Sequence, residues 1–280
     1  MHPLVLLRLS RAPNGLMMFF AVLVGVIFSD KKLVTPETAV YAFITSFGLT
    51  SSSMALNDYF DREVDAVNNP GRPIPSGQLS PTAAVLFAAF TGAAGLFSAF
   101  LTSLSCLLLA SLTFTVAIFY NASLKRTGFL GNLAVSYAVV APFLYGSLLS
   151  DGEVSQNVLV LALLAFLANT GREVIKGMTD VEGDAIRKVV TIARKYGLVA
   201  ASRLGASLYL LAVALSPLPF LLGVVSFYYL PIVFVADAGF IFSSIRILRN
   251  PSASEARKQK KLTLLWMFLA LLSFAIGGFL

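Results

Sequence analysis

Acidic and amide side chains recur at a four-residue step in two separate polar segments. The first segment holds Asn57, Asp61 and Asp65, and the second holds Asp180 and Asp184. Residues four apart share one face of a helix, so each set predicts a row of oxygen atoms. Oxygen ligands without histidine or cysteine suit Mg²⁺, which is commonly shared between carboxylates and substrate phosphates. The spacing therefore predicts two facing acidic clusters that hold a diphosphate through Mg²⁺.

Basic residues lie close to both acidic segments in the sequence. Lysine and arginine bind phosphate directly, so these cations are predicted diphosphate contacts: Arg72, Lys125, Arg172, Lys176 and Arg187. Lys125 and Arg126 are explained equally well as a signal of membrane topology. The cluster at 246–261 is assigned to topology and contact with anionic lipid.

The chain has a single histidine, His2, and a single cysteine, Cys106. One cysteine excludes a disulfide framework, and one histidine near the start of the chain argues strongly against histidine chemistry.

The composition restricts where this chemistry takes place. Of the 280 residues, 57% are hydrophobic and 12% are charged, whereas soluble domains carry about 25% charged residues. The mean hydropathy is +0.82. These values exclude a soluble enzyme, a disordered chain and a nucleic-acid-binding domain, and they indicate an integral membrane protein.

Runs without charge predict the membrane spans, each of which needs about 20 apolar residues. The runs are 12–29, 38–57, 73–124, 127–150, 154–171, 204–236 and 262–280. The run 73–124 is long enough for two spans with a turn near Thr102 and Ser103. The run from 204 continues past Asp237 to Ile245 and divides at the proline-rich turn 216–219. The sequence thus predicts an all-α bundle of nine transmembrane helices in one domain, 1–280.

The positions of lysine and arginine predict the orientation of these spans. With nine spans and a cytoplasmic N-terminus, 19 of the 21 lysines and arginines fall on the inner side, as the positive-inside rule requires. Only Lys31 and Lys32 fall outside. The long polar loops, 58–80 and 172–203, then both lie inside. We therefore expect a multi-pass protein of the cell membrane with an active site that faces the cytoplasm.

The two acidic motifs also suggest an internal repeat. Asp180 follows Asp61 by 119 residues, and Asp184 follows Asp65 by the same number. The motifs follow the second and sixth predicted spans, which cross the membrane in the same direction. Parallel repeats place equivalent segments on one side of the membrane. The spacing therefore predicts two four-helix units and one additional helix.

Two stretches around these residues resemble the UbiA-type intramembrane prenyltransferases. The stretch from Asn57 to Gly77, NDYFDREVDAVNNPGRPIPSG, is similar to the first signature of that family, and DVEGD at 180–184 is similar to the second. The segment 172–184 is most similar to the archaeal ether-lipid branch, although Gly177 stands where that branch usually has an acidic residue. Enzymes of that branch transfer a geranylgeranyl group to geranylgeranylglyceryl phosphate.

The resemblance implies roles for individual residues. Asn57, Asp61, Asp65, Asp180 and Asp184 would hold Mg²⁺ and the diphosphate. Arg72, Tyr120, Lys125 and Lys176 would contact substrate. The implied partners are a prenyl diphosphate, a lipid or aromatic acceptor and membrane lipids, with no nucleic acid and no evident protein partner.

The predicted reaction separates an allylic carbon from its diphosphate. Mg²⁺ would neutralise charge on the leaving group, and the ring of Tyr120 would shield the allylic cation. An interfacial tyrosine is an equally good explanation of Tyr120. Asp58 and Glu173 are weak candidates for the base. Asp237, inside a span, has either a substrate contact or a structural partner.

Three other functions fit parts of the sequence. A prenyltransferase with an aromatic or ring acceptor, such as a quinone, haem or chlorophyll precursor, would use the same diphosphate motifs. A CDP-alcohol phosphotransferase would show the pattern DGxxAR…GxxxDxxxD, which is absent from this sequence. An ion-coupled secondary transporter would use Asp237 and the acidic faces, but it would need polar pathways on both sides of the membrane.

Overall fold

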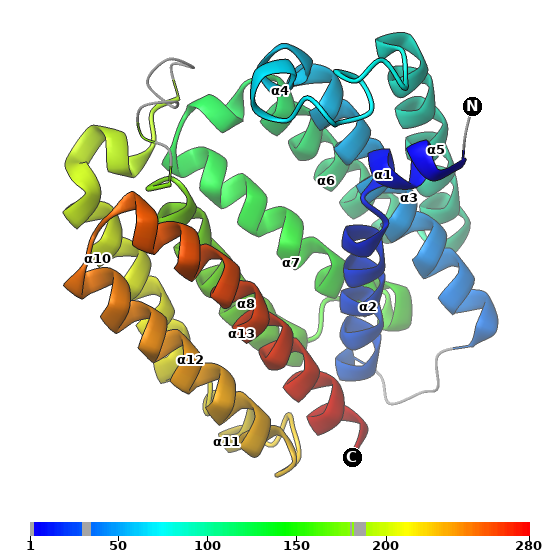
Figure 1. Cartoon of the computed structure of the whole chain (residues 1–280). Helices are drawn as coiled ribbons and strands as arrows, with labels where there is room; N and C mark the ends of the chain where they lie inside the picture. Colours follow the sequence, from blue (N-terminus) through cyan, green and yellow to red (C-terminus); the bar gives the residue numbers. More distant parts are fainter. Residues whose placement is uncertain (1–2, 30–34, 180, 182–188) are drawn as a thin grey trace. The chain divides into compact units, whose positions relative to one another are not determined.

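A computed structural model describes residues 3–29, 35–179, 181 and 189–280. All regular elements within these residues are helices, as Figure 1 shows. The predicted all-α class is therefore confirmed.

Nine helices in the described residues are long and apolar enough to cross a membrane, which confirms the predicted number of spans. They are α2 (Ala12–Ser29), α3 (Pro36–Phe60), α5 (Pro81–Thr102), α6 (Leu104–Ala122), α7 (Phe129–Asp151), α8 (Gln156–Lys176), α10 (Ile192–Leu215) with its extension α11 (Leu218–Leu221), α12 (Tyr229–Arg249) and α13 (Ala253–Phe279). Shorter helices are α1 (Pro3–Ser10), α4 (Arg62–Asn68) and the 3₁₀ helix η1 (Leu124–Arg126).

The predicted breaks between spans are confirmed, but several helices extend into the predicted loops. Ser103 separates α5 from α6, and the segment 216–217 separates α10 from α11. The loop 172–203 is shorter than predicted, because α8 continues to Lys176 and α10 begins at Ile192. Lysine and arginine are good helix formers, so a charged residue ends an apolar run without ending the helix.

Side-chain caps fix where many of the helices begin. Ser and Thr accept a hydrogen bond from a backbone N–H of the first turn, which otherwise has no partner. This cap is present at the start of five of the helices: Thr35, Ser80, Ser155, Thr191 and Ser252. Pro36 and Pro81 follow two of them, at the position where the missing proline N–H costs nothing.

The chain forms two compact units. Unit 1 contains Met1–Ala122 and Ala141–Val154, and unit 2 contains Ser123–Val140 and Ser155–Leu280. The boundary therefore falls inside α7, and the predicted pair of four-helix repeats is not confirmed. The second half of α7 belongs to unit 1 because it packs tightly against α2. A Cβ atom on Gly25 would lie 2.2 Å from the carbonyl oxygen of Phe143.

Unit 1 is built around the close packing of α3 against α5. A Cβ atom on Gly48 would lie 2.7 Å from the carbonyl oxygen of Thr91, and Ser52 Oγ donates to the carbonyl of Ala88 at 2.7 Å. Small residues at such crossings let helix backbones approach within a membrane. The crossing fixes the end of α3, from which the first acidic motif continues.

Two apolar clusters complete the packing of unit 1. Leu9 of α1 packs with Ala55 of α3 and with Ile74 and Leu79 of the following loop, so α1 is held against the rest of the unit. The free thiol of Cys106 lies in a second cluster and is fully buried.

Unit 2 contains α8, α10, α12 and α13, which pack side by side (Figure 1). The helices α8 and α10 cross at two glycines, where a Cβ atom on Gly171 would lie 2.9 Å from the carbonyl oxygen of Gly205. Tyr209 is fully buried beside Phe240. This crossing fixes the end of α8, which carries Arg172 and Lys176.

Candidate active site

The first acidic motif forms a continuous column across the junction of α3 and α4. The structure divides the predicted single helix in two, with Asp61 between them. The backbone N–H of Asp61 still donates to the carbonyl of Asn57, and that of Asp65 donates to the carbonyl of Asp61. The four-residue step therefore continues through the junction.

Amide side chains hold the carboxylates at both ends of this column. Asn57 Nδ2 donates to Asp61 Oδ2 at 3.2 Å, and Asn69 Nδ2 donates to Asp65 Oδ1 at 3.1 Å. Asp65 is buried, whereas Asp61 is half-buried. The two carboxylates thus occupy different environments, and Asp61 is the more accessible of the pair.

Two arginines pair with the buried carboxylates of Asp58 and Asp65. Asp58 is 2% exposed and forms ion pairs with Arg11 at 2.7 Å and with Arg72 at 3.1 Å. The same Arg72 nitrogen also pairs with Asp65. A buried carboxylate is costly unless it is paired, so Asp58 serves as the anchor that fixes both arginines beside the motif.

The backbone of Arg11 is adapted to this contact. Its φ angle of 47° lies in the left-handed region, which is unfavourable for a residue with a Cβ atom. Arg11 Nη2 donates to Asn57 Oδ1 at 3.2 Å as well as to Asp58. These contacts hold the turn between α1 and α2 in place, and they connect α1 to the acidic column.

The helix α6 adds a further polar contact to this site. Asn121 is buried, accepts a hydrogen bond from Asn57 Nδ2 at 3.0 Å and donates to the carbonyl of Ser53 at 3.2 Å. Tyr120 precedes it and is half-buried. The structure therefore places Tyr120 next in the chain to a residue that contacts the acidic column.

The donor chemistry of the column suits Mg²⁺. Asp61 and Asp65 supply carboxylate oxygens, and Mg²⁺ sites typically use one or two carboxylates together with substrate phosphates and water. In the described part of the chain, no three histidine, cysteine, aspartate or glutamate side chains are grouped as a metal site. A metal at these two carboxylates would complete its coordination with substrate oxygens and water. Asp180 and Asp184 of the second motif, together with Arg187, lie outside the described residues.

Unit 2 carries a cationic cluster at the end of α8. Glu173, 5% exposed, accepts from Arg172 at 2.9 Å and from Lys176 at 2.8 Å. Lys260 of α13 interacts electrostatically with all three. Three cations around one carboxylate leave a net positive charge, which suits binding of an anionic group. Glu173 and Asp58 each have two cationic partners, which explains both carboxylates without a role as base.

The remaining predicted residues also have defined positions. Lys125 lies in η1 of unit 2 and is half-buried, and the carbonyl of its neighbour Arg126 accepts from the backbone of Val190.

Asp237 accepts from Ser216 Oγ at 2.6 Å, and Tyr229 donates to the carbonyl of the same serine at 2.8 Å. Asp237 therefore has a structural partner that links α12 to the end of α10.

The contacts of Arg11 and Asn121 are not predicted from the sequence. Arg11 counted only as a topology signal, because its partners lie 46 and 47 residues away and no local spacing connects them. The signal that could have identified Asn121 is a polar amide next to Tyr120 at the end of an otherwise apolar run.

Comparison with known proteins identifies the family of this chain. The model of the UbiA prenyltransferase family matches residues 18–272. The chain belongs to this family. It is therefore a multi-pass membrane enzyme that transfers prenyl groups. UbiA membership rules out the phosphotransferase and the transporter as functions of this chain.

Curated UbiA relatives include archaeal enzymes that match along nearly their whole length. The chain is 38% identical to digeranylgeranylglyceryl phosphate synthase of Archaeoglobus fulgidus over 97% of this chain and 94% of that protein. It is 37% identical to the protein of the same name from Methanopyrus kandleri over 96% of this chain and 97% of that protein.

Solved structures of UbiA proteins share the fold. One structure, described for digeranylgeranylglyceryl phosphate synthase in membranes, has a TM-score of 0.83 and 28% identity and covers 98% of both chains. A UbiA homologue from Archaeoglobus fulgidus bound to GPP and Mg²⁺ has a TM-score of 0.67 and 16% identity, over 97% of this chain and 100% of that chain.

Proposed function

We propose that this enzyme transfers a geranylgeranyl group from its diphosphate to geranylgeranylglyceryl phosphate. The observation that carries the proposal is the near full-length similarity to archaeal enzymes named for that product. In this reaction the bond between the allylic carbon and the diphosphate oxygen breaks. A new ether bond forms to a glyceryl hydroxyl oxygen, and diphosphate and a proton leave.

The acidic column would position the diphosphate of the donor. In our proposal Asp61 and Asp65, with Asn57, Asp180 and Asp184, would hold Mg²⁺. The homologue bound to GPP and Mg²⁺ supports the use of this metal. The metal, when bound, supplies Lewis-acid neutralisation of the leaving group. Arg72 is anchored by Asp58, so it meets the developing phosphate charge without first being ordered.

The cations of unit 2 would contribute further phosphate contacts. Glu173 holds Arg172 and Lys176 in fixed positions, and Lys125 of η1 would add a third donor. Tyr120 would face the allylic carbon, where the negative face of its ring shields a developing cation. Each of these groups would stabilise charge that increases as the bond breaks, and such differential stabilisation is the requirement for catalysis.

A transfer assay on purified protein tests this proposal. Labelled geranylgeranyl diphosphate and Mg²⁺ are supplied with geranylgeranylglyceryl phosphate or with a panel of aromatic acceptors, and products are separated by chromatography. We expect product only with the glyceryl phosphate. Product only with an aromatic acceptor would refute the proposed acceptor and move the enzyme to a ring-prenylating branch.

We further propose that the active site faces the cytoplasm and that the whole chain, 1–280, is one prenyltransferase domain. The basic residues support this orientation, because 19 of the 21 lysines and arginines fall on the predicted inner side, as the positive-inside rule requires. Nine spans then place the N-terminus inside and the C-terminus outside.

Reporter fusions measure this orientation directly. A reporter that works only in the cytoplasm is expected to be active when it is fused before Met1. A reporter that works only outside the membrane is expected to be active when it is fused after Leu280. The opposite pattern, or both ends on the same side, would contradict the nine-span orientation.

A further inference from the structure

A cleft in unit 1 adjoins the acidic column and is lined by both apolar and polar side chains. It has a volume of about 820 Å³ and lies between α1, the start of α2 and the loop before α5. Sites for small ligands typically measure about 300–1,000 Å³. Leu4 and Leu7 line the cleft and are 60% and 53% exposed, whereas Arg8, Arg11 and Gln78 provide polar groups. Such a cleft suits a molecule with an anionic head and an apolar chain.

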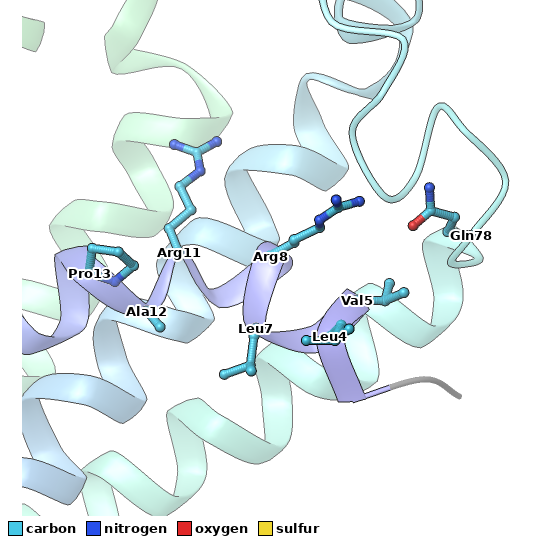
Figure 2. Close-up of a pocket in the computed structure, with 8 residues that line it drawn as sticks. All are labelled: Leu4, Val5, Leu7, Arg8, Arg11, Ala12, Pro13 and Gln78. Carbon is cyan, nitrogen blue, oxygen red and sulfur yellow. The ribbon is translucent and has the colours of Figure 1, made fainter.

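The polar groups of this cleft are available for a ligand. Arg8 and Gln78 are both exposed, and neither side chain has a hydrogen bond or ion pair with the described residues. Figure 2 shows Arg8 extending from α1 toward the segment that carries Gln78. Guanidinium and amide groups together match the oxygens of a phosphate and a hydroxyl.

The walls of the cleft are fixed in position before any ligand binds. Leu9 anchors α1 in the apolar core of unit 1, and Val5 packs against the same core while it also lines the cleft. The loop on the opposite side is held by the buried side chains of Ile74 and Leu79. Gly77 has a φ angle of 74°, a conformation that glycine adopts without strain, and this turn presents Gln78. Pre-organised walls reduce the entropy cost of binding.

Arg11 connects the cleft to the acidic column. It lines the cleft and also donates to Asn57 and Asp58. A molecule that contacts Arg11 in the cleft would therefore be linked to Asp61 through Arg11 and Asn57. The carboxylates of the column repel a second phosphate, so an acceptor phosphate needs cations outside the column.

We infer that this cleft binds the phosphate of the acceptor, with Arg8 as its main contact and Gln78 as a hydrogen-bonding partner. This inference rests on the proposed function, because it takes the phosphate from the glyceryl phosphate acceptor. A phospholipid of the surrounding membrane carries the same chemistry, and the experiment separates the two sources. Arg8 and Gln78 would thus determine specificity for a phosphorylated acceptor, while the donor diphosphate is held elsewhere.

Steady-state kinetics of the full-length enzyme in phospholipid-free detergent tests the inference. The acceptor concentration is varied at saturating geranylgeranyl diphosphate, for the wild type, Arg8→Ala and Gln78→Ala. Charge-assisted hydrogen bonds dominate phosphate binding, so we expect Arg8→Ala to raise the acceptor KM by about 10- to 100-fold. Gln78→Ala should raise it by about 3- to 10-fold. The donor KM and kcat should change less than about twofold, because the contact is not part of bond breaking.

A phosphate-free acceptor and a matched variant complete the design. With geranylgeranylglycerol, the wild type and Arg8→Ala should have the same acceptor KM, because neither retains a phosphate contact. The control variant is Arg257→Ala. Arg257 is an exposed arginine of α13 and is not among the residues that line the cleft, so this variant should behave as the wild type. Thermal unfolding without donor or Mg²⁺ measures binding of geranylgeranylglyceryl phosphate. The stabilisation by this acceptor should fall strongly in Arg8→Ala, less in Gln78→Ala and not in Arg257→Ala.

The possible failures are distinguishable. A wild type that transfers nothing to the glyceryl phosphate contradicts the proposed function itself. A wild type that transfers normally, with Arg8→Ala unchanged or equally impaired with the phosphate-free acceptor, overturns the inference alone. A defect that occurs only after anionic phospholipid vesicles are added would assign the cleft to membrane lipid and would also overturn it.

Discussion

Asp61→Ala is expected to abolish prenyl transfer while the protein remains folded. Asp61 is the accessible carboxylate of the column, so its loss removes a ligand that would act on the leaving group. Loss of transition-state charge stabilisation typically lowers kcat by about 10²- to 10³-fold for one donor, and the loss of a metal ligand is expected to reach the upper end. Single-turnover transfer and thermal unfolding of the purified variant measure the two effects separately.

A neighbouring carboxylate provides the control for this substitution. Glu63 lies two residues further on. Its side chain is 84% exposed, and its ion pair within the described residues is with Arg62 at 3.2 Å. Glu63→Ala should therefore retain activity within about twofold, because exposed ion pairs contribute little. Asp65→Ala should differ from both, because it also leaves Arg72 with one partner fewer and should lower thermal stability. Full activity of Asp61→Ala would refute the proposed role of the first motif.

Removal of divalent metal is expected to have a comparably large effect. In excess chelator, turnover should fall by at least about 10²-fold, because the diphosphate would leave without Lewis-acid neutralisation. Added Mg²⁺ should restore it. Asp61→Asn should raise the Mg²⁺ concentration required for half-maximal activity, because a neutral amide is a weaker ligand than a carboxylate.

We expect removal of metal to lower activity without unfolding the protein. Asp58 and Asp65 are already neutralised by arginines, so the described part of the site does not need a metal to hold its charges. The thermal unfolding midpoint should therefore remain nearly constant when metal is removed. Unchanged turnover in excess chelator would rule out metal-assisted departure of the diphosphate.

The sequence predicts the membrane spans well, because hydropathy over about 20 residues is a strong physical constraint. The turn at Ser103 and the proline-rich turn at 216–219 lie where the structure breaks the helices. Helix ends are predicted less well. Arg172 and Lys176 continue α8, because charged side chains at a helix end can reach water while the backbone remains helical.

The candidate site likewise contains features that are local in the sequence and contacts between residues that are far apart in it. The row of Asn57, Asp61 and Asp65 depends on a four-residue spacing, which is visible in the sequence. The pairing of Asp58 with Arg11 joins residues 47 positions apart and depends on the packing of α1 against α3. No periodicity records such a contact, so Arg11 could only be counted as one positive charge among many.

The buried position of Cys106 has a practical consequence. It is the only cysteine of the chain, and its side chain is fully enclosed in the packing of unit 1. Thiol-reactive dyes and spin labels react with accessible thiolates, so the native protein should give almost no background labelling. A single cysteine introduced on the surface would then carry one probe per molecule, and spectroscopic studies of this membrane enzyme could begin from the natural sequence.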